Sequence, residues 1–354
     1  MRTVRARRAG AGARFPEGTK VAARTAMTRA LSFLAVASLA LVTALAACSA
    51  DSGDVPRGPS PAAPEDAANG PVSPAPESEA GALPPAPPVD AGPDGASPPK
   101  NYDRGSSAGC GKANAGTGLQ TRSMTIAGKA RSYLRFVPPG YQPNVPLAVV
   151  FGLHGSGGTS EKARAIFELE AKAGGKAIFV YPQGLPDPAF DDANRWITTK
   201  GSEDFAFLSA LIAEVEASHC VDQDRIFVSG FSDGARMTSM VGCFLGDVVR
   251  AIAPVAPGGT ATTLPLAGCV GEVGIWEGLG NDDVDHEPGA TRVRDYYRAA
   301  NGCAATRTIT TPAGCETYDG CRGAVPAVWC TYPGGHAWPP IGAAGVWSFF
   351  ASFK

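Results

Sequence analysis

A serine flanked by glycines lies where a strand-like segment of the chain gives way to a helix-like one. Residues 225–229 (RIFVS) form an apolar run typical of a buried strand, and residues 235–245 carry apolar side chains at helical spacing. Between them, residues 230–234 (GFSDG) match G-x-S-x-G, the pattern of a strained strand-to-helix turn. Glycine is needed two residues to either side of Ser232 because the turn leaves no room for side chains there. The segment predicts an exposed, nucleophilic Ser232 above the carboxyl edge of a sheet.

The rest of the chain after residue 120 alternates between the same two patterns, which predicts a three-layer α/β sandwich with a mostly parallel sheet. We expect a hairpin over 121–137, strands over 146–153, 176–181, 225–229, 249–256, 273–276 and 327–332, and helices over 160–173, 204–219, 235–245 and 291–301. The runs 146–153 and 176–181 are continuously apolar, as in strands covered by helices on both faces.

The histidine that would serve Ser232 follows by elimination. A serine hydroxyl needs a neighbouring base to become a nucleophile, and the chain has only His154, His219, His286 and His336. In sandwiches with this turn the base follows the serine in the chain, which leaves the last two. His286 lies in an acidic loop (DDVDHE) and is expected at the surface. His336 lies in GGHAWP, on a glycine-rich loop after a strand, and is the predicted base.

A second glycine-rich segment, LHGSGGT at 153–159, follows an early strand and precedes a helix. Glycines there would let backbone N–H groups face a developing oxyanion. The backbone N–H groups of Ser156 and Asp233 are the predicted donors, and His154 is expected to brace the loop. A phosphate cradle is the alternative, but no lysine of a P-loop follows.

The N-terminal part predicts export and lipid attachment. Residues 28–47 form an apolar run preceded by arginines, as in a signal peptide, so residues 1–47 are expected to be removed; Met27 is an alternative start. The run ends in Leu45-Ala46-Ala47-Cys48, which resembles the lipobox of bacterial lipoproteins and implies lipidation of Cys48. The alternatives are an ordinary secretory signal or a permanent anchor helix. Ser49 after the cysteine favours a cell-surface or outer-membrane location, with the lipid as the contact to the membrane.

The segment that follows is expected to be a tether. Residues 51–100 hold 14 of the chain's 31 prolines and no aromatic residue or isoleucine, so they cannot bury enough apolar surface to fold. We therefore divide the chain into a signal peptide (1–47), a lipidated cysteine with a disordered linker (48–105), and one folded domain (106–354).

Cysteine content and charge narrow the class of protein. Eight cysteines remain once Cys48 is set aside, an even number that suggests up to four disulfides in an exported chain, with Cys321 and Cys330 engaged locally. Their spacings match no zinc motif, so no metal is predicted. The net charge of −2 and the absence of a basic cluster in the folded part argue against nucleic acid as a partner.

Several motifs together resemble one family of secreted esterases. They are LHGSGGT (153–159), YPQG (181–184), VDQDRIFVSGFSDGARM (221–237), IAPVAPG (252–258), RDYYRAANGC (294–303) and GGHAWP (334–339). The resemblance is to the α/β-hydrolases that include feruloyl esterases, acetylxylan esterases and polyhydroxybutyrate depolymerases. It implies a Ser-His-Asp triad that hydrolyses feruloyl or acetyl esters of plant polysaccharides, or short polyesters, without metal or cofactor.

The acid of the triad is where the chain departs from that family. Family members carry a segment like H-G-T-x-D-x-x-V, but residues 277–284 here read EGLGNDDV, which places Glu277 at the histidine and Asn281 at the acid. An amide lacks the charge that stabilises an imidazolium. We predict that a shifted loop lets Asp282 act, with Asp283 or Asp285 as alternatives. With no acid, the chain would be a catalytically impaired, surface-binding lipoprotein.

Two tryptophans are candidates for substrate contacts. Trp338 follows the predicted base, and Trp196 follows the YPQG motif; their rings could form walls for an aromatic or sugar-bearing ester, or simply pack in the core. A polyester depolymerase using the same triad is the main alternative among enzymes.

Overall fold

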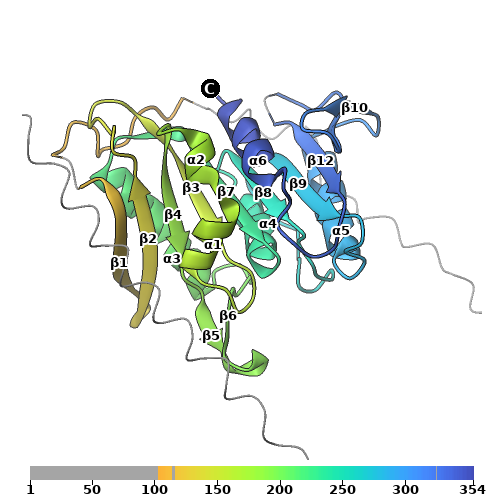
Figure 1. The fold of residues 1–354 in the computed structure, drawn as a ribbon, viewed down its shortest axis with the longest axis horizontal. Helices are drawn as coiled ribbons and strands as arrows, with labels where there is room; N and C mark the ends of the chain where they lie inside the picture. Colours follow the sequence, from red (N-terminus) through yellow and green to blue (C-terminus); the bar gives the residue numbers. More distant parts are fainter. Residues whose placement is uncertain (1–102, 114–115, 324) are drawn as a thin grey trace, which may run out of the picture. The chain divides into compact units, whose positions relative to one another are not determined.

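The computed structural model describes residues 103–113, 116–323 and 325–354. Their centre is a ten-stranded sheet in the order β1-β2-β4-β3-β7-β8-β9-β12-β11-β10 (Figure 1). The predicted signal peptide, Cys48 and nearly all of the predicted linker lie outside the described residues.

Six parallel strands form the middle of the sheet: β4 (Ala177–Pro182), β3 (Leu147–Leu153), β7 (Val221–Phe231), β8 (Ala251–Val255), β9 (Gly274–Gly280) and β12 (Ala327–Tyr332). Antiparallel pairs extend both edges: β1 (Gly118–Ile126) with β2 (Lys129–Val137), and β11 (Cys315–Tyr318) with β10 (Arg307–Thr310). Every residue of β4, β8 and β9 is buried, as expected for parallel strands covered on both faces.

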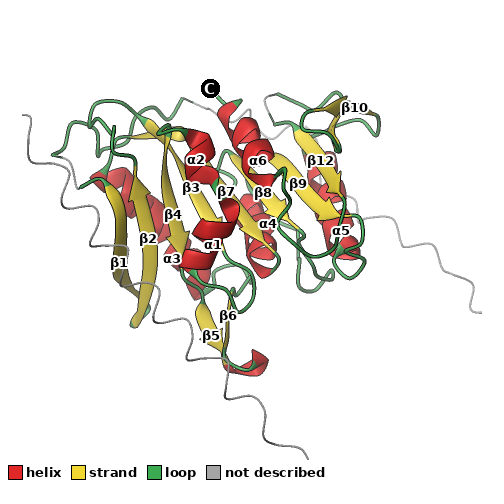
Figure 2. Cartoon of the chain, in the orientation of Figure 1, coloured by secondary structure: helices red, strands yellow, loops and turns green. Residues whose placement is uncertain are grey.

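Helices cover both faces of the sheet (Figure 2). On one face lie α1 (Ser160–Phe167), α2 (Leu169–Ala173) and α6 (Gly342–Ala351). On the other face lie α3 (Glu203–Ser218), α4 (Asp233–Phe244) and α5 (Glu287–Ala300). This arrangement confirms the predicted three-layer α/β sandwich and puts the carboxyl ends of β7, β9 and β12 at one edge.

The structure departs from the predicted elements in several places, and β10, β11 and α6 are elements that the sequence analysis did not expect. The single helix expected over 160–173 is two helices, because Glu168 adopts a left-handed conformation with φ of 51° between them. A small hairpin was also missed; it consists of β5 (Leu185–Asp187), the 3-10 turn η1 (Pro188–Phe190) and β6 (Ala193–Arg195). Its strands have three residues each, too few to produce a periodic pattern in the sequence.

Four disulfides confirm the prediction from cysteine content. Their pairs are Cys110–Cys220, Cys243–Cys269, Cys303–Cys321 and Cys315–Cys330. As expected, Cys321 and Cys330 each pair locally, 18 and 15 residues from their partners. Such bonds persist in oxidising compartments, in keeping with an exported protein.

Within the part of the chain that the structure describes, none of the helices has the length and hydropathy needed to cross a bilayer.

Candidate active site

Ser232 lies on the tight turn that its glycines predict. It has φ of 57° and ψ of −118°, a conformation that costs energy for a residue with a side chain. A Cβ atom on Gly230 would lie 2.4 Å from the carbonyl oxygen of Gly234, and one on Gly234 would lie 2.2 Å from that of Leu153. Both positions therefore exclude side chains, and Ser232 directly follows the last residue of β7.

His336 meets Ser232 across 104 residues of chain. The Ser232 hydroxyl and His336 Nε2 are 2.9 Å apart. The histidine follows β12 on a loop in which Gly334 has φ of 108°, a conformation that glycine adopts without strain. The structure thus brings together the two residues that the sequence selected as nucleophile and base.

The acid beside His336 is Asp283, which corrects the prediction of Asp282. His336 Nδ1–H donates to Asp283 Oδ2 at 2.7 Å, whereas Asp282 is exposed. The backbone N–H groups of Asn281 and Asp282 donate to the carbonyls of Tyr332 and Gly334. These bonds carry the pairing of β9 and β12 two residues beyond the strands, and only the next residue turns inward.

Asp283 is a buried carboxylate with both oxygens in use. Its side chain is 3% exposed, and an ionised group so placed needs a partner for each oxygen. Oδ2 accepts from His336, and Oδ1 accepts from Nδ1–H of His286 at 2.7 Å. Burial, followed by the charge of Asp283, raises the pKa of Tyr332 on β12.

His286 is a member of the site that the sequence analysis assigned to the surface. Its ring is half-buried and stacks on the ring of His336, with centroids 3.7 Å apart and an interplanar angle of 11°. The signal that could have found it is the spacing: a histidine three residues after an acid, at the start of a helix, can return its side chain to that acid.

Among the residues that the structure describes, Asp283, His286 and His336 form a group whose ligand atoms lie within 4.8 Å of one another, close enough to hold a metal ion. A tetrahedral ion needs lone pairs that converge on one point. The two imidazole rings are nearly parallel, and Nδ1 of each is engaged by the carboxylate. The cluster therefore favours hydrogen bonding between one acid and two imidazoles over metal binding.

The predicted oxyanion donors lie on either side of Ser232. Asp233 is the first residue of α4, where backbone N–H groups have no partner within the helix and favour negative charge. The 153–159 loop lies against the serine, since a Cβ on Gly155 would be 3.2 Å from Ser232 Cβ. In this loop Gly157 and Gly158 donate to other carbonyls, whereas no hydrogen bond among the described residues uses the N–H of Ser156.

The 153–159 loop is braced by His154, as predicted. This side chain is 2% exposed; its Nδ1 donates to the carbonyl of Gly155, and its Nε2 accepts the N–H of Gly184 at 2.9 Å. Burial lowers the pKa of His154, so the ring stays neutral and keeps one donor and one acceptor.

The two tryptophans proposed as substrate contacts differ in burial. Trp196 is 3% exposed, and its Nε1–H donates to the carbonyl of His154 at 2.8 Å. Trp338 stacks on Phe167 of α1, with centroids 4.1 Å apart. Trp196 is therefore packed in the core, the alternative that the sequence left open, whereas Trp338 is only partly buried. Contact between Trp338 and a substrate stays a prediction.

Comparison with known proteins identifies the family. No family model matches the chain. Over 242 residues the chain is 33% identical to feruloyl esterase C of Emericella nidulans, covering 62% of this chain and 83% of that protein. It is 30% identical over 265 residues to the probable feruloyl esterase C of Aspergillus terreus, covering 69% and 90%. The chain belongs to the feruloyl esterase family.

The fold of this esterase matches that of a solved relative. Acetyl xylan esterase from Aspergillus awamori superposes with a TM-score of 0.53 at 16% identity, covering 66% of this chain and 98% of that one. The predicted family, the α/β-hydrolase fold and the prediction of a serine carboxylesterase are thereby confirmed.

The carboxylate of Asp233 joins the nucleophile turn of the esterase to the β5–β6 hairpin. It is 3% exposed and accepts from Arg195 at 3.0 Å, from Arg236 at 2.8 Å and from the backbone N–H of Trp196 at 2.9 Å. The backbone carbonyl of Asn194 accepts the N–H of Gly157. The hairpin is therefore fixed both to the turn and to the predicted oxyanion loop.

The hairpin presents one aromatic side chain to solvent. Phe190 is 52% exposed, and the guanidinium of Arg195 lies 3.7 Å from the centre of its ring. One face of the ring is thus covered by a cation that Asp233 holds in place. Phe190 is an exposed aromatic surface, linked to the nucleophile turn through Arg195 and Asp233, that the sequence did not point to.

Glu277, at the family's histidine position on β9, is a buried acid without a partner. It is 1% exposed, and neither carboxylate oxygen has a hydrogen-bond partner in the part of the chain that the structure describes. Burial raises the pKa of Glu277 well above its usual value. Burial thus disfavours the charged form of Glu277, and the hydrogen bond to His336 comes from Asp283 instead.

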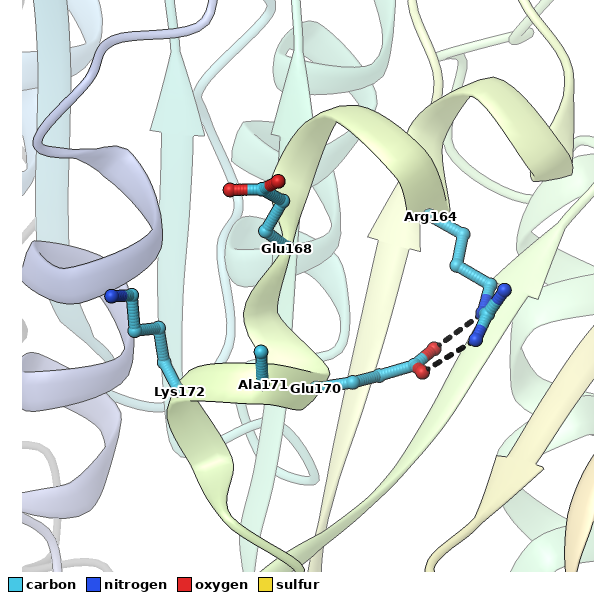
Figure 3. A pocket seen from close by; sticks show the side chains of 5 residues that line it. All are labelled: Arg164, Glu168, Glu170, Ala171 and Lys172. Atoms are coloured by element: carbon cyan, nitrogen blue, oxygen red, sulfur yellow. Dashed lines mark hydrogen bonds and ion pairs between the residues drawn. The ribbon is translucent and has the colours of Figure 1, made fainter. Parts of the chain in front are cut away.

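A surface hollow on α1 and α2 contains none of the site residues. It is lined by Arg164, Glu168, Glu170, Ala171 and Lys172 (Figure 3). Its main feature is the two-point ion pair between Arg164 and Glu170, at 2.7 and 2.8 Å. The hollow thus belongs to the outer surface of the helices, separate from Ser232.

Proposed function

We propose that this protein hydrolyses feruloyl or acetyl esters of plant polysaccharides through a Ser232–His336–Asp283 triad. The observation that carries the proposal is the chain of two hydrogen bonds, 2.9 Å from Ser232 Oγ to His336 Nε2 and 2.7 Å from His336 Nδ1 to Asp283 Oδ2. The names of the relatives, feruloyl and acetyl xylan esterases, support the class of substrate.

In the first half of the reaction His336 acts as base. Asp283 accepts a hydrogen bond from Nδ1–H, which keeps the proton on Nδ1 and leaves the Nε2 lone pair facing the serine hydroxyl. Ser232 Oγ attacks the ester carbonyl while its proton moves to Nε2, and the backbone N–H groups of Ser156 and Asp233 stabilise the oxyanion. The alcohol then leaves with the proton from Nε2, and the acyl group remains on the serine.

In the second half a water molecule repeats the attack. His336 removes a proton from the water, the hydroxide adds to the acyl carbonyl, and Ser232 leaves with the proton. The negative charge of Asp283 stabilises the imidazolium that forms in each half. Because that carboxylate is buried beside only two imidazole donors, its charge acts on them with little screening.

The presence of Asp283 beside His336 argues against the alternative of a catalytically impaired surface-binding protein. That alternative depended on Asn281 occupying the family position of the acid. With Asp283 bonded to His336, an acid is available two residues later, and this favours an active enzyme.

The proposal is tested by activity on defined esters. The wild-type protein is expected to release ferulate from methyl ferulate or feruloylated xylan, or acetate from acetylated xylan. Ser232→Ala should abolish these activities and the labelling by a fluorophosphonate. Release of product from a polyhydroxybutyrate film but from none of these esters would favour the depolymerase alternative. Equal activity in the wild type and Ser232→Ala would refute the triad.

We also propose that the mature protein is anchored to the membrane by lipid on Cys48 and carries its esterase domain at the end of the proline-rich linker. The support is the lipobox-like sequence before Cys48 and the composition of residues 51–100. Cys48→Ala should release the protein from membranes in cell fractionation. Continued retention of that variant would contradict lipid anchoring.

A further inference from the structure

The backbone next to His336, the proposed base, does little to fix the orientation of its imidazole ring. His336 follows Gly334 and Gly335, and its side chain is 32% exposed. Glycines give a loop conformational freedom. Two in-plane hydrogen bonds, to Ser232 and Asp283, define where the ring nitrogens point. Motion of the ring out of that plane must be resisted by whatever packs on its faces.

Two rings pack on His336. His286 stacks at a centroid distance of 3.7 Å, and Phe231 at 4.7 Å with an interplanar angle of 29°. Two rings at these distances and small angles cannot share one face of the imidazole without overlapping each other. His336 is therefore held between Phe231, from the nucleophile turn, and His286, from the start of α5.

His286 is itself fixed by rigid elements. It precedes the first residue of α5, where its carbonyl accepts the N–H of Ala290 and its N–H donates to the carbonyl of Asp283. Its ring packs against Gly258, where a Cβ atom would lie 2.4 Å from His286 Cδ2. The start of a helix thus supports the ring that covers His336.

The same side chain holds the acid. An ionised carboxylate buried as deeply as that of Asp283 must satisfy both oxygens, and His286 supplies the donor for Oδ1 at 2.7 Å. With Oδ1 bound, the rotation of the carboxylate is fixed and Oδ2 faces His336. Loss of that donor would leave Oδ1 unsatisfied and free the carboxylate to turn.

We propose that His286 is a positioning residue of the esterase, which fixes the Asp283 carboxylate through Nδ1–H and clamps the His336 ring against Phe231. The inference rests on the proposed function, because it acts through two members of the triad. No hydrogen bond between His286 and Ser232 exists among the described residues, so its effect on the reaction is indirect.

Three substitutions separate the two contacts. His286→Asn keeps an N–H donor the same number of bonds from Cα as Nδ1, but loses the stacked ring. His286→Phe keeps a ring on His336 and loses the donor to Asp283. His286→Ala loses both. Asp285→Ala, an exposed neighbour in the same loop, is the matched control.

We expect kcat on methyl ferulate to fall by about 10-fold or more in His286→Ala, as for loss of a hydrogen bond to a charged group. His286→Asn and His286→Phe should each recover part of the loss, and Asp285→Ala should match the wild type. KM should stay within about twofold throughout, because no substrate contact is removed. The rate of fluorophosphonate labelling should fall in parallel with kcat.

The double variant Asp283→Asn/His286→Phe, which keeps a ring on His336, decides whether the donor of His286 acts through the acid. If it does, removing that donor costs little once Asp283→Asn has been made, and the two effects are not additive. Additive effects, unchanged kcat in His286→Ala, or a loss confined to KM would overturn the inference. Retained activity in Ser232→Ala would instead overturn the proposed function, so the two failures are distinguishable.

Discussion

The nucleophile turn and the acid loop are two halves of one site, built in different ways. At the turn, Gly230 and Gly234 face backbone carbonyls so closely that no side chain fits. In the acid loop, residues 281–283 follow β9, and Asp283 reaches His336 only because Asn281 and Asp282 first pair with the segment after β12. Steric exclusion within a short segment leaves a readable pattern in the sequence, whereas a loop shaped by a partner far along the chain does not.

The largest expected effect separates two adjacent acids in that loop. Asp283→Asn should lower kcat by about 10⁴-fold, as an amide in place of the acid does in a serine protease. Asp282→Asn should leave kcat within about twofold, because that side chain is exposed and does not contact His336. Steady-state kinetics on methyl ferulate provide the measurement, and the reverse ranking would restore Asp282 as the acid.

The second prediction contrasts a glycine of the nucleophile turn with a glycine of the loop that carries His336. Gly234→Ala would place a Cβ 2.2 Å from the carbonyl oxygen of Leu153, and we expect a loss of unfolding free energy of about 3 kcal/mol or more. The nearest atom to a Cβ on Gly335 is 3.9 Å away, so Gly335→Ala should change stability by less than about 1 kcal/mol. Urea denaturation measures both, and equal losses would contradict the contrast.

The third prediction uses the pH dependence of stability to test Glu277, four residues before the start of the acid loop. Because burial raises its pKa in the folded state, the folded protein holds this proton to higher pH than the unfolded chain, where the pKa is about 4.3. The contribution of the Glu277 proton to the free energy of unfolding is complete below that pH. It decreases by about 1.4 kcal/mol per pH unit as the pH rises from there toward the pKa of the folded state.

Glu277→Gln has no such titration, so its stability relative to the wild type should increase between pH 5 and pH 8. Thermal unfolding at both pH values measures the difference. Glu272→Gln, at an acid that is 24% exposed in an ion pair with Arg322, is the control and should show no comparable increase. A constant difference for Glu277→Gln would mean that Glu277 is ionised in the folded protein.

The smallest expected effect concerns the hairpin held at the nucleophile turn. Phe190→Ala removes an aromatic surface that is 52% exposed, and stacking of a ring on such a surface is worth about 1 kcal/mol. We expect KM for feruloylated xylan to rise by about three- to tenfold, while kcat changes little. Ile309→Ala, 82% exposed on β10, is the control. Equal KM in both variants would separate Phe190 from substrate binding.

Features set by local patterns could be predicted from the sequence, whereas features set by contacts between distant segments could not. The central strands, Ser232 and His336 were predictable because apolar runs and glycine spacing are local consequences of burial and steric exclusion. Asp283 was one of the alternatives left open, since choosing among neighbouring acids requires the register of β9 against β12. The spacing of His286 from Asp283 was a usable local signal, whereas the stacking of His286 on His336 and the packing of Trp196 depend on contacts between separate elements.

The acid and the base follow β9 and β12, which are hydrogen-bonded neighbours, while the nucleophile follows β7, with β8 in between. Backbone bonds from Asn281 and Asp282 to the segment after β12 extend that coupling to the loops themselves. We therefore expect Asp283 and His336 to move together when they move relative to Ser232. If β9 and β12 slid relative to β7, the distance from Ser232 Oγ to His336 Nε2 would increase, while the hydrogen bond between His336 and Asp283 would remain. An inactive conformation of this enzyme would then still contain the intact pair of acid and base.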